Sequence, residues 1–385
     1  MKLYSKKNIL LLLLAVGLLA CSWTSSSDNT NGDFDSECKA ILQEWYKDGQ
    51  KQYASVLKNK RLTVNGNTMP LFWSYDQSTK PEDGRALFIS LHGGGGAPPE
   101  VNDGQWRNQQ HLYQPNSEDV YLCPRAAFNT WDLHFRVEAD PFYREIIHMA
   151  VTCMDVNPNK VYLMGYSAGG DGVWRLAPRH ADLWAAASMM AGHPGDVSLV
   201  NLRNTPFMIW CGEYDGAYNR NRECAKRIQE MSDLHAGDPQ GYVYSGHIVK
   251  NKGHWMDLED AAAIGWMYQY KRNPYPTRLV WQQEEVTVPQ FYWLKVNDDE
   301  MERGKKVVAQ YNGNTIDIEH CDYKTLTIRL CDKMMNLDKP VIVRMGGKEV
   351  FNGKVKRSAE VFKKTLYERN DPDYAFSAEI TVGGE

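Results

Sequence analysis

The sequence predicts an α/β domain with a mostly parallel sheet flanked by helices, followed by a C-terminal all-β sandwich domain. The first observation behind this prediction is a series of short, almost continuously apolar runs, such as 85–91, 160–164 and 206–211. Runs of this kind are typical of parallel strands that are covered on both faces. Helical patterns such as 141–154 separate them, and strands that alternate with helices indicate βαβ units.

A change of pattern near residue 275 is the second observation. Beyond Pro276 the apolar runs become short and alternating, and turn dipeptides such as Asn312-Gly313 separate them. Short alternating strands with frequent turns are the pattern of a β-sandwich. We therefore expect the α/β domain to occupy residues 34–275 and an accessory β-sandwich to occupy residues 276–385.

The elements of the α/β domain are expected in a simple order. An N-terminal helix leads to a hairpin with its turn at 65–67, which we place at one antiparallel edge of the sheet. Strands and helices then alternate. In chain order we expect helix 35–57, hairpin strands 62–64 and 69–75, strands 85–91 and 120–123, helix 141–154, strand 160–164, helix 171–177, a helix end and strand within 183–191, strand 206–211, helix 221–234, strand 242–245 and helix 260–270.

The N-terminus indicates an export signal over residues 1–20. A basic start precedes the apolar run 9–20, which is too short to cross a bilayer comfortably. The run ends in a Leu-Leu-Ala-Cys sequence that resembles a bacterial lipobox and implies lipid attachment to Cys21; a plain secretory signal that contains a cysteine is the alternative. Residues 21–33 are polar and are expected to be a flexible tether. We therefore expect an exported bacterial lipoprotein, anchored to a membrane and facing the periplasm or the cell surface.

Composition argues against nucleic acid and metal as partners. The formal net charge is −4 and there is no basic tract, which disfavours nucleic-acid binding. Apart from Cys21 there are seven cysteines, and none forms a Cys-x-x-Cys pair, so we expect no metal site. An odd number leaves at least one thiol unpaired, and a bridge between Cys321 and Cys331 stays open.

The segment Gly165-Tyr166-Ser167-Ala168-Gly169 carries the strongest chemical signal. It lies between an expected strand and an expected helix, and a Gly-x-Ser-x-Gly string in that context indicates a nucleophile elbow. The glycines allow a turn sharp enough to leave Ser167 strained, with its hydroxyl exposed. Ser167 is therefore the candidate nucleophile, although the same string also arises by chance in Gly-rich turns.

A serine hydroxyl needs a base that takes its proton and an acid that orients the base. On this scaffold the order along the chain is serine, acid, histidine. Asp215 follows the strand 206–211 and is the candidate acid, ahead of its neighbour Glu213. His254, in a loop after the last strand, is the candidate base, whereas His247 is expected to pack within that strand.

The glycine run that follows His92 is the candidate oxyanion loop. Acyl transfer needs backbone donors where negative charge develops, and a run without side chains lets backbone and substrate approach closely. We expect the N–H groups of Gly94 and Ala168 to supply the two donors. A phosphate-binding loop is the alternative, but no Gly-Lys-Ser or Gly-x-Gly-x-x-Gly string supports it.

With the glycine loop, the elbow, Asp215 and His254, residues 60–270 resemble the α/β-hydrolase superfamily. Within it they are similar to secreted bacterial lipoprotein esterases of the polyhydroxybutyrate depolymerase and feruloyl esterase type. In that group a Pro, an Asn and a Trp follow the strand before the elbow, and Pro124, Asn129 and Trp131 match. The resemblance implies that Trp131 lies at the substrate cleft; a packed loop tryptophan is the alternative. The disulfide usual near that tryptophan has no counterpart in this chain.

These residues predict a serine hydrolase that cleaves carboxylic esters through a Ser-His-Asp triad and an acyl-enzyme, with no cofactor. An open cleft with many aromatic residues suits acyl groups on polysaccharide or another bulky ester. Tyr166 and Trp255, beside the nucleophile and the base, are expected to bind substrate together with Trp131. A serine peptidase of the prolyl-oligopeptidase-like type and a non-catalytic anchored binding protein are the alternatives. The sandwich domain is expected either to act as a support or, through residues such as Trp281, to bind glycan.

Overall fold

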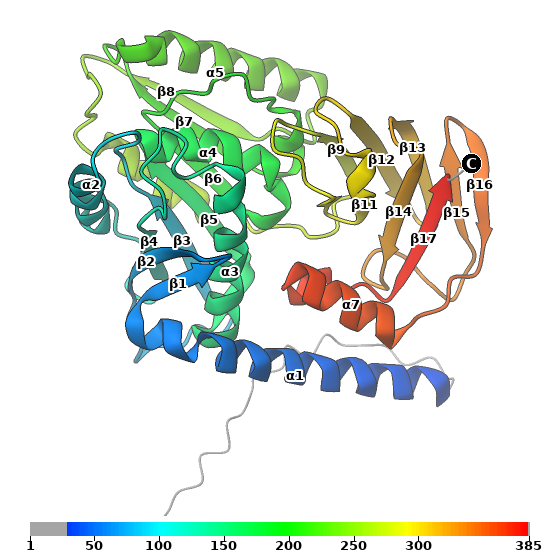
Figure 1. The fold of residues 1–385 in the computed structure, drawn as a ribbon. Helices are drawn as coiled ribbons and strands as arrows, with labels where there is room; N and C mark the ends of the chain where they lie inside the picture. The colour runs from blue at the N-terminus through cyan, green and yellow to red at the C-terminus, as the bar shows by residue number, and fades with distance from the viewer. Residues whose placement is uncertain (1–28, 384–385) are drawn as a thin grey trace, which may run out of the picture.

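The computed structural model describes residues 29–383 (Figure 1). The predicted signal at 1–20, Cys21 and the tether residues up to 28 lie outside the described residues. Helix α1 (Asn29–Asn59) begins at Asn29, so the expected tether is helical over its last five residues, 29–33. The prediction was wrong there because it weighed only local polarity, whereas α1 is one continuous helix whose later turns pack on the protein through Trp45 and Tyr53. Within residues 29–383 no helix is both long and apolar enough to span a membrane.

The larger sheet has eight strands in the order β1-β2-β4-β3-β5-β6-β7-β8. The β1–β2 hairpin is antiparallel and lies at one edge, β2 pairs with β4 antiparallel, and the remaining pairs are parallel. This confirms the predicted α/β fold with a mostly parallel sheet. The strands are β1 (Arg61–Val64), β2 (Asn67–Ser74), β3 (Arg85–Leu91), β4 (Val120–Pro124), β5 (Val156–Tyr166), β6 (Ala186–Met190), β7 (Phe207–Gly212) and β8 (Tyr244–Val249).

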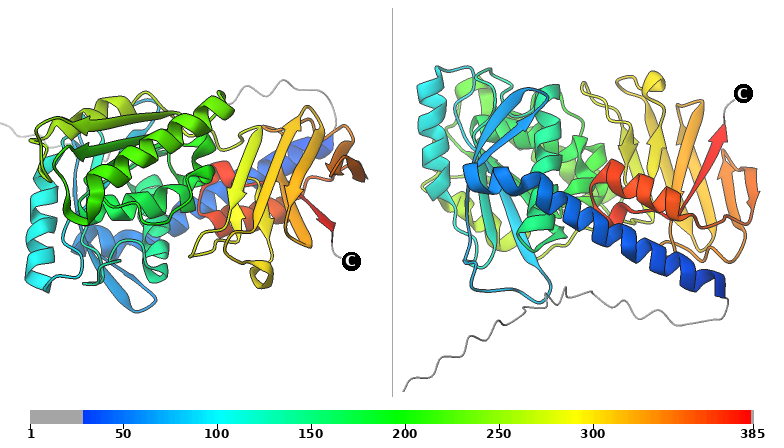
Figure 2. Two further views of the ribbon diagram at one scale, coloured as in Figure 1. Left: turned by 90° about the horizontal axis from the view of Figure 1, so that it is seen from above. Right: turned by 60° about the horizontal axis from the view of Figure 1, so that its bottom comes forward.

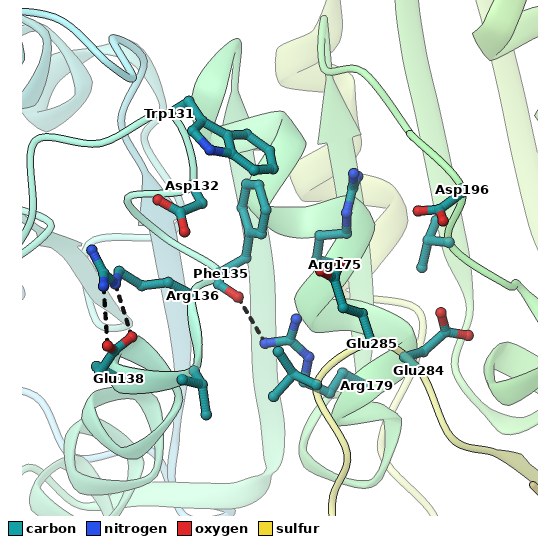
Figure 3. A pocket seen from close by; sticks show the side chains of 13 residues that line it. Trp131, Asp132, Phe135, Arg136, Glu138, Arg175, Arg179, Asp196, Glu284 and Glu285 are labelled. Carbon is teal, nitrogen blue, oxygen red and sulfur yellow. Dashed lines mark hydrogen bonds and ion pairs between the residues drawn. The ribbon is translucent and has the colours of Figure 1, made fainter. Parts of the chain in front are cut away.

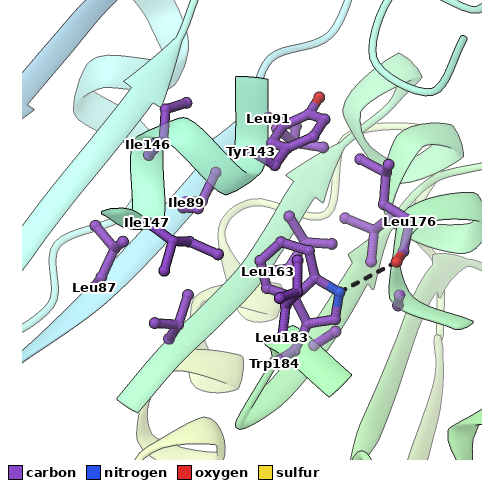
Figure 4. Packing of buried hydrophobic residues seen from close by; sticks show 14 of the residues in the cluster. Leu87, Ile89, Leu91, Tyr143, Ile146, Ile147, Leu163, Leu176, Leu183 and Trp184 are labelled. Carbon is purple, nitrogen blue, oxygen red and sulfur yellow. Dashed lines mark hydrogen bonds between the residues drawn. The ribbon is translucent and has the colours of Figure 1, made fainter. Parts of the chain in front are cut away.

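Helices cover both faces of this sheet because its central strands are apolar on both sides. On β3, Leu87 and Ile89 belong to a buried cluster with α3 and α4, and the alternate residue Phe88 packs into a second cluster near α6. Figure 4 shows the first cluster, in which the Trp184 indole donates to the carbonyl oxygen of Leu176 at 3.1 Å. The helices are α2 (Pro99–Leu112), α3 (Asp140–Cys153), α4 (Ala168–Arg179), α5 (Arg220–Gly237) and α6 (Ala262–Met267).

The C-terminal part contains two further sheets, with strand orders β10-β11-β14-β17 and β16-β15-β13-β12-β9. Residues of both sheets share one buried cluster, and this cluster includes Trp281 and Trp293. Trp281 is therefore a core residue and does not present a surface to glycan. The strands are β9 (Arg278–Gln282), β10 (Gln290–Phe291), β11 (Leu294–Val296), β12 (Lys306–Asn312), β13 (Thr315–Cys321), β14 (Thr325–Leu330), β15 (Val341–Met345), β16 (Lys348–Gly353) and β17 (Ala378–Gly383).

The C-terminal part is not all-β as expected, because helix α7 (Ala359–Arg369) interrupts it. Ser358 caps the helix by accepting a hydrogen bond from the N–H of Val361 at 3.2 Å, and Leu366 is fully buried. Figure 1 shows α1 running beneath the α/β part, and the right-hand view of Figure 2 shows it alongside α7. Helix α7 is stabilised by this long-range packing, and a search of the sequence for alternating strands does not detect such packing.

Buried ion pairs join the two parts of the chain. Arg369 of α7 pairs with Asp182 of the α/β part, and both side chains are almost completely buried. Arg272 and Asp371 form a second buried pair at 2.7 Å. The expected domain boundary near residue 275 falls between α6 and β9. All seven cysteines of the described part are free thiols, so the open question of a Cys321–Cys331 bridge is answered in the negative.

Candidate active site

Ser167 lies at the sharp turn between β5 and α4, with φ 59° and ψ −121°. A residue with a side chain adopts this conformation only at an energetic cost, so the surrounding structure must hold it there. Its own N–H donates to the carbonyl oxygen of Met190 at 2.9 Å, and its carbonyl oxygen accepts from the N–H of Asp171 at 3.0 Å. These two bonds tie the turn to the neighbouring strand β6 and to the first turn of α4.

The glycines of the elbow are required for close packing rather than for an unusual backbone angle. Neither Gly165 nor Gly169 has φ in the left-handed region, where Ser167 itself lies. A Cβ on Gly165 would lie 2.4 Å from the carbonyl oxygen of Gly169, and one on Gly169 would lie 2.1 Å from that of Leu91. The glycines therefore allow the sharp turn that leaves Ser167 strained, as predicted, and they do so by permitting this close packing.

Three predicted residues form one hydrogen-bonded chain. The Oγ of Ser167 lies 2.9 Å from Nε2 of His254, and Nδ1 of His254 lies 2.8 Å from Oδ2 of Asp215. Because carboxylates only accept, Nδ1 carries the proton in this arrangement and Nε2 is free to accept the serine proton. The Asp215 side chain is 1% exposed and that of His254 is 41% exposed, so the acid is shielded while the base faces the solvent side.

The two rival residues lie elsewhere. The carboxylate of Glu213 accepts a hydrogen bond from the N–H of Asn251 at 2.9 Å, which braces the loop before His254. His247 stacks on Trp210 with ring centroids 3.9 Å apart, as expected for a histidine packed within β8. Only Asp215 and His254 therefore have the geometry of an acid and a base for Ser167.

Two residues near the triad were missed by sequence reasoning. The guanidinium of Arg220, at the start of α5, lies 3.6 Å from Oδ1 of Asp215, the carboxylate oxygen that is not bonded to His254. The side chain of Asn102 in α2 is fully buried beneath the glycine loop. No local pattern marks either residue, because each comes from a helix whose position depends on the tertiary fold.

The glycine loop passes beside the elbow, since a Cβ on Gly93 would lie 3.3 Å from the Cβ of Ser167. Gly94 and Gly95 have φ of 114° and 108°, which favour glycine. The amide of Asn102 accepts from the N–H of Gly95 at 3.1 Å and donates to its carbonyl oxygen at 3.0 Å. Within residues 29–383 no acceptor is hydrogen-bonded to the N–H of Gly94 or of Ala168. These two N–H groups are therefore free to donate, and their role as the oxyanion donors stays a prediction.

His92 braces this loop from below. It is fully buried, its Nδ1 lies 2.6 Å from the carbonyl oxygen of Gly93, and its Nε2 accepts from the N–H of Ala126 at 3.1 Å. Burial holds the pKa of His92 well below its ordinary value, and nearby His134 lowers it further. The ring is therefore neutral at physiological pH and links the loop to the segment after β4.

The aromatic residues expected at the substrate differ in their exposure. Trp131 is 66% exposed and rests on Phe135 with ring centroids 5.2 Å apart, and Trp255 is 45% exposed. Tyr166 is buried, and its hydroxyl donates to the backbone carbonyl of His254. Burial raises the pKa of Tyr166, so this hydroxyl stays protonated and holds the histidine loop. Trp131 and Trp255 are accessible to a ligand, and a substrate-binding role for all three residues stays a prediction.

A cavity of about 320 Å³ begins at Trp131 (Figure 3). None of its lining residues belongs to the triad, and they include Arg179 and Glu284. Its connection to the elbow is the glycine loop, since a Cβ on Gly96 would lie 3.4 Å from the backbone nitrogen of Trp131. In the described part of the chain no three His, Cys, Asp or Glu side chains are grouped so as to hold a metal ion.

No protein-family model and no curated protein matches this chain. Among solved structures it is similar to a thermostable esterase, with 19% identity and a TM-score of 0.46 over 55% of this chain and 62% of that one. It is also similar to the Est1E protein of Butyrivibrio proteoclasticus with bound ferulic acid (13% identity, 54% and 98% covered, TM-score 0.36). A third is the S-formylglutathione hydrolase FrmB of Staphylococcus aureus (15%, 54% and 94%, 0.37). These likenesses cover about half of the chain at TM-scores below 0.5, so the site has to be interpreted from its own geometry.

Proposed function

We propose that this chain is a serine hydrolase that cleaves carboxylic esters through an acyl-enzyme. The observation that supports this most strongly is the continuous chain of hydrogen bonds from Asp215 through His254 to Ser167, with Ser167 held in a strained conformation at the end of a strand. A serine that serves only in packing does not need a buried carboxylate connected to it through two hydrogen bonds. The arrangement is the one that activates a hydroxyl as a nucleophile.

The reaction follows from the positions of the donors and acceptors. Ser167 Oγ attacks the ester carbonyl while Nε2 of His254 takes its proton, and buried Asp215 stabilises the imidazolium that forms. The N–H groups of Gly94 and Ala168 donate to the developing oxyanion. His254 then returns the proton to the leaving alcohol, which departs and leaves the acyl group on Ser167. Water, activated by the same histidine, releases the acid.

Labelling and turnover test this proposal together. A fluorophosphonate probe is expected to label the wild-type protein and not Ser167→Ala, and the wild type is expected to release nitrophenol from 4-nitrophenyl acetate. Release of nitroaniline from an aminoacyl nitroanilide, without ester cleavage, would favour the peptidase alternative. If the probe does not label Ser167 and neither compound is cleaved, the binding-protein alternative holds.

We further propose that the protein is exported and anchored to a membrane by a lipid on Cys21. We also propose that the two C-terminal sheets form an accessory β-sandwich. The sequence resemblance to a lipobox supports the first, and the buried cluster that the two sheets share supports the second. Cys21→Ser is expected to move the protein from the membrane fraction to the soluble fraction of the producing cells. A wild-type protein found only in the soluble fraction would refute the anchor.

A further inference from the structure

Arg220 carries a positive charge that is largely buried and makes few hydrogen bonds. Its side chain is 11% exposed, and its Nε is buried without a hydrogen-bond partner among residues 29–383. Its Nη1 donates to the carbonyl oxygen of Ala217 at 3.5 Å, which is long for a hydrogen bond. Burying a charge costs free energy unless other groups compensate for it. The compensation for Arg220 therefore has to come from neighbouring carboxylates.

Two carboxylates act on this guanidinium. Nη1 of Arg220 lies 3.6 Å from Oδ1 of Asp215, the acid of the proposed triad. The second carboxylate is that of Asp171 in the first turn of α4, which accepts from the N–H of His193 at 2.6 Å. Burial raises the pKa of Asp171, whereas this hydrogen bond and the charge of Arg220 lower it. Arg220 therefore interacts with the catalytic acid and with a second acid beside the elbow.

The other titratable groups packed around Arg220 and His254 are neutral near neutral pH. Burial lowers the pKa of His193, which keeps its ring uncharged. Burial raises the pKa of Tyr166, whose ring centroid lies 5.5 Å from that of His254. Contact with the Cys211 thiol and burial raise the pKa of Cys224, which therefore stays a thiol. None of these groups adds a charge to the site.

The charged groups on the surrounding loops and helices have partners of their own. These are Glu223 with Lys226 at 2.7 Å, Lys252 with Asp257 at 2.5 Å, Glu213 with the N–H of Asn251 at 2.9 Å, and Asp260 with the hydroxyl of Tyr113 at 2.6 Å. Arg175 also acts on Asp171, and its guanidinium donates to backbone carbonyls. Among residues 29–383, Arg220 is the only arginine or lysine within 4.0 Å of the Asp215 carboxylate.

The charge of Arg220 opposes a positive charge on His254. A carboxylate 2.8 Å from the ring stabilises the imidazolium, and a cation on the other oxygen of that carboxylate disfavours it. The side chains of Asp215 and Arg220 are both shielded from water, so screening of this effect is weak. An imidazolium is unable to accept the serine proton. Without Arg220, the base would therefore be protonated, and the site inactive, at a higher pH.

We propose that Arg220 is a positioning residue that acts through Asp215 and extends the activity of the site towards lower pH. Its charge offsets part of the negative charge of Asp215 and Asp171, so that the imidazole of His254 stays neutral and accepts the serine proton. This inference rests on the proposed ester hydrolysis at Ser167 and adds a residue that controls the pH range of that reaction.

The test is the pH profile of kcat/KM for 4-nitrophenyl acetate, measured with the full-length protein. In Arg220→Gln the midpoint of the acid limb is expected to lie about one pH unit above that of the wild type, the effect of removing a unit charge two contacts away. Arg220→Lys keeps the charge and is expected to restore the wild-type midpoint. Arg222→Gln removes the same charge from an exposed position in the same helical turn, and is the matched control with no shift expected.

Asp171→Asn provides an independent variant with the opposite sign. Its amide oxygen can still accept from the N–H of His193, but the negative charge is gone, so Arg220 acts more strongly on Asp215. The midpoint of the acid limb is therefore expected to move to lower pH. If Arg220→Gln does not fold, as judged by circular dichroism, an unchanged midpoint in Asp171→Asn overturns the inference.

Two results with a folded Arg220→Gln variant would also overturn it. An unchanged midpoint removes the role of the charge and leaves the proposed hydrolase intact. A profile that is lowered equally at every pH shows that Arg220 serves only the structure. A wild type that does not cleave the ester and is not labelled at Ser167 by a fluorophosphonate removes the hydrolase and the inference together, and labelling distinguishes that case from the other two.

Discussion

Replacing Asp215 by Asn tests the proposed triad with the smallest change of shape. The carboxylate faces two donors, Nδ1 of His254 at 2.8 Å and the guanidinium of Arg220 at 3.6 Å. An amide has only one oxygen, and the permanently charged Arg220 competes for it. If that oxygen turns to Arg220, the NH₂ group faces Nδ1, so the imidazole must carry its proton on Nε2. In that tautomer His254 is unable to accept the proton of Ser167.

The expected loss is large because the tautomer controls the reaction. In a triad of this kind the wrong tautomer lowers kcat by roughly 10⁴-fold, or about 5.5 kcal/mol in activation free energy. The assay is the steady-state hydrolysis of 4-nitrophenyl acetate, with circular dichroism to confirm the fold. Glu213→Gln is the matched control: its oxygen can still accept from the N–H of Asn251, so a change of no more than about twofold is expected. An Asp215→Asn variant within about tenfold of the wild type would refute the assignment of the acid, more so if Glu213→Gln loses activity.

Three further predictions concern stability. Gly169→Ala is expected to cost about 3 kcal/mol or more in unfolding free energy, since its Cβ would lie 2.1 Å from a backbone oxygen; urea denaturation measures this, and a loss below about 1 kcal/mol would contradict the packing argument. Arg369→Leu leaves the carboxylate of Asp182 buried without its closest cation and is expected to cost about 3 kcal/mol in unfolding free energy. This is near the lower end of the range for breaking a buried ion pair, because Arg144 still interacts with that carboxylate. Lys363→Leu, which breaks an exposed pair with Glu44, is the control and is expected to cost less than about 1 kcal/mol; equal losses in the two variants would argue against the burial effect. Burial raises the pKa of Glu284 to about 7, so the stabilising contribution of this carboxyl is complete below its ordinary pKa and is lost as pH rises through 7. Glu284→Gln is therefore expected to flatten the pH dependence of the urea midpoint between pH 5 and 8. An unchanged slope would show that other groups cause this pH dependence.

The sequence alone determined the parts of this protein that depend on local patterns. The apolar strands and the helices between them predicted the α/β sheet, because burial on both faces requires continuous apolar runs. Ser167, Asp215 and His254 were predicted for a related reason: each follows a strand of the parallel sheet, and the carboxyl ends of such strands meet at one edge. The Gly-x-Ser-x-Gly string and the chain order serine, acid, histidine were enough to select all three.

Only the tertiary structure decided which contacts between distant segments complete the site. Arg220 beside Asp215 and Asn102 beneath the glycine loop depend on how α5 and α2 dock, and neither residue has a local signature. Helix α7 owes its position to packing on α1, so an expectation based on alternating strands missed it. The same holds for the loop that carries Glu284 and Glu285, which meets the Trp131 cavity from far along the chain. The type of each side chain can be read from the sequence, but the proximity of distant segments is a property of the whole fold, and the walls of the Trp131 cavity are built from such proximity.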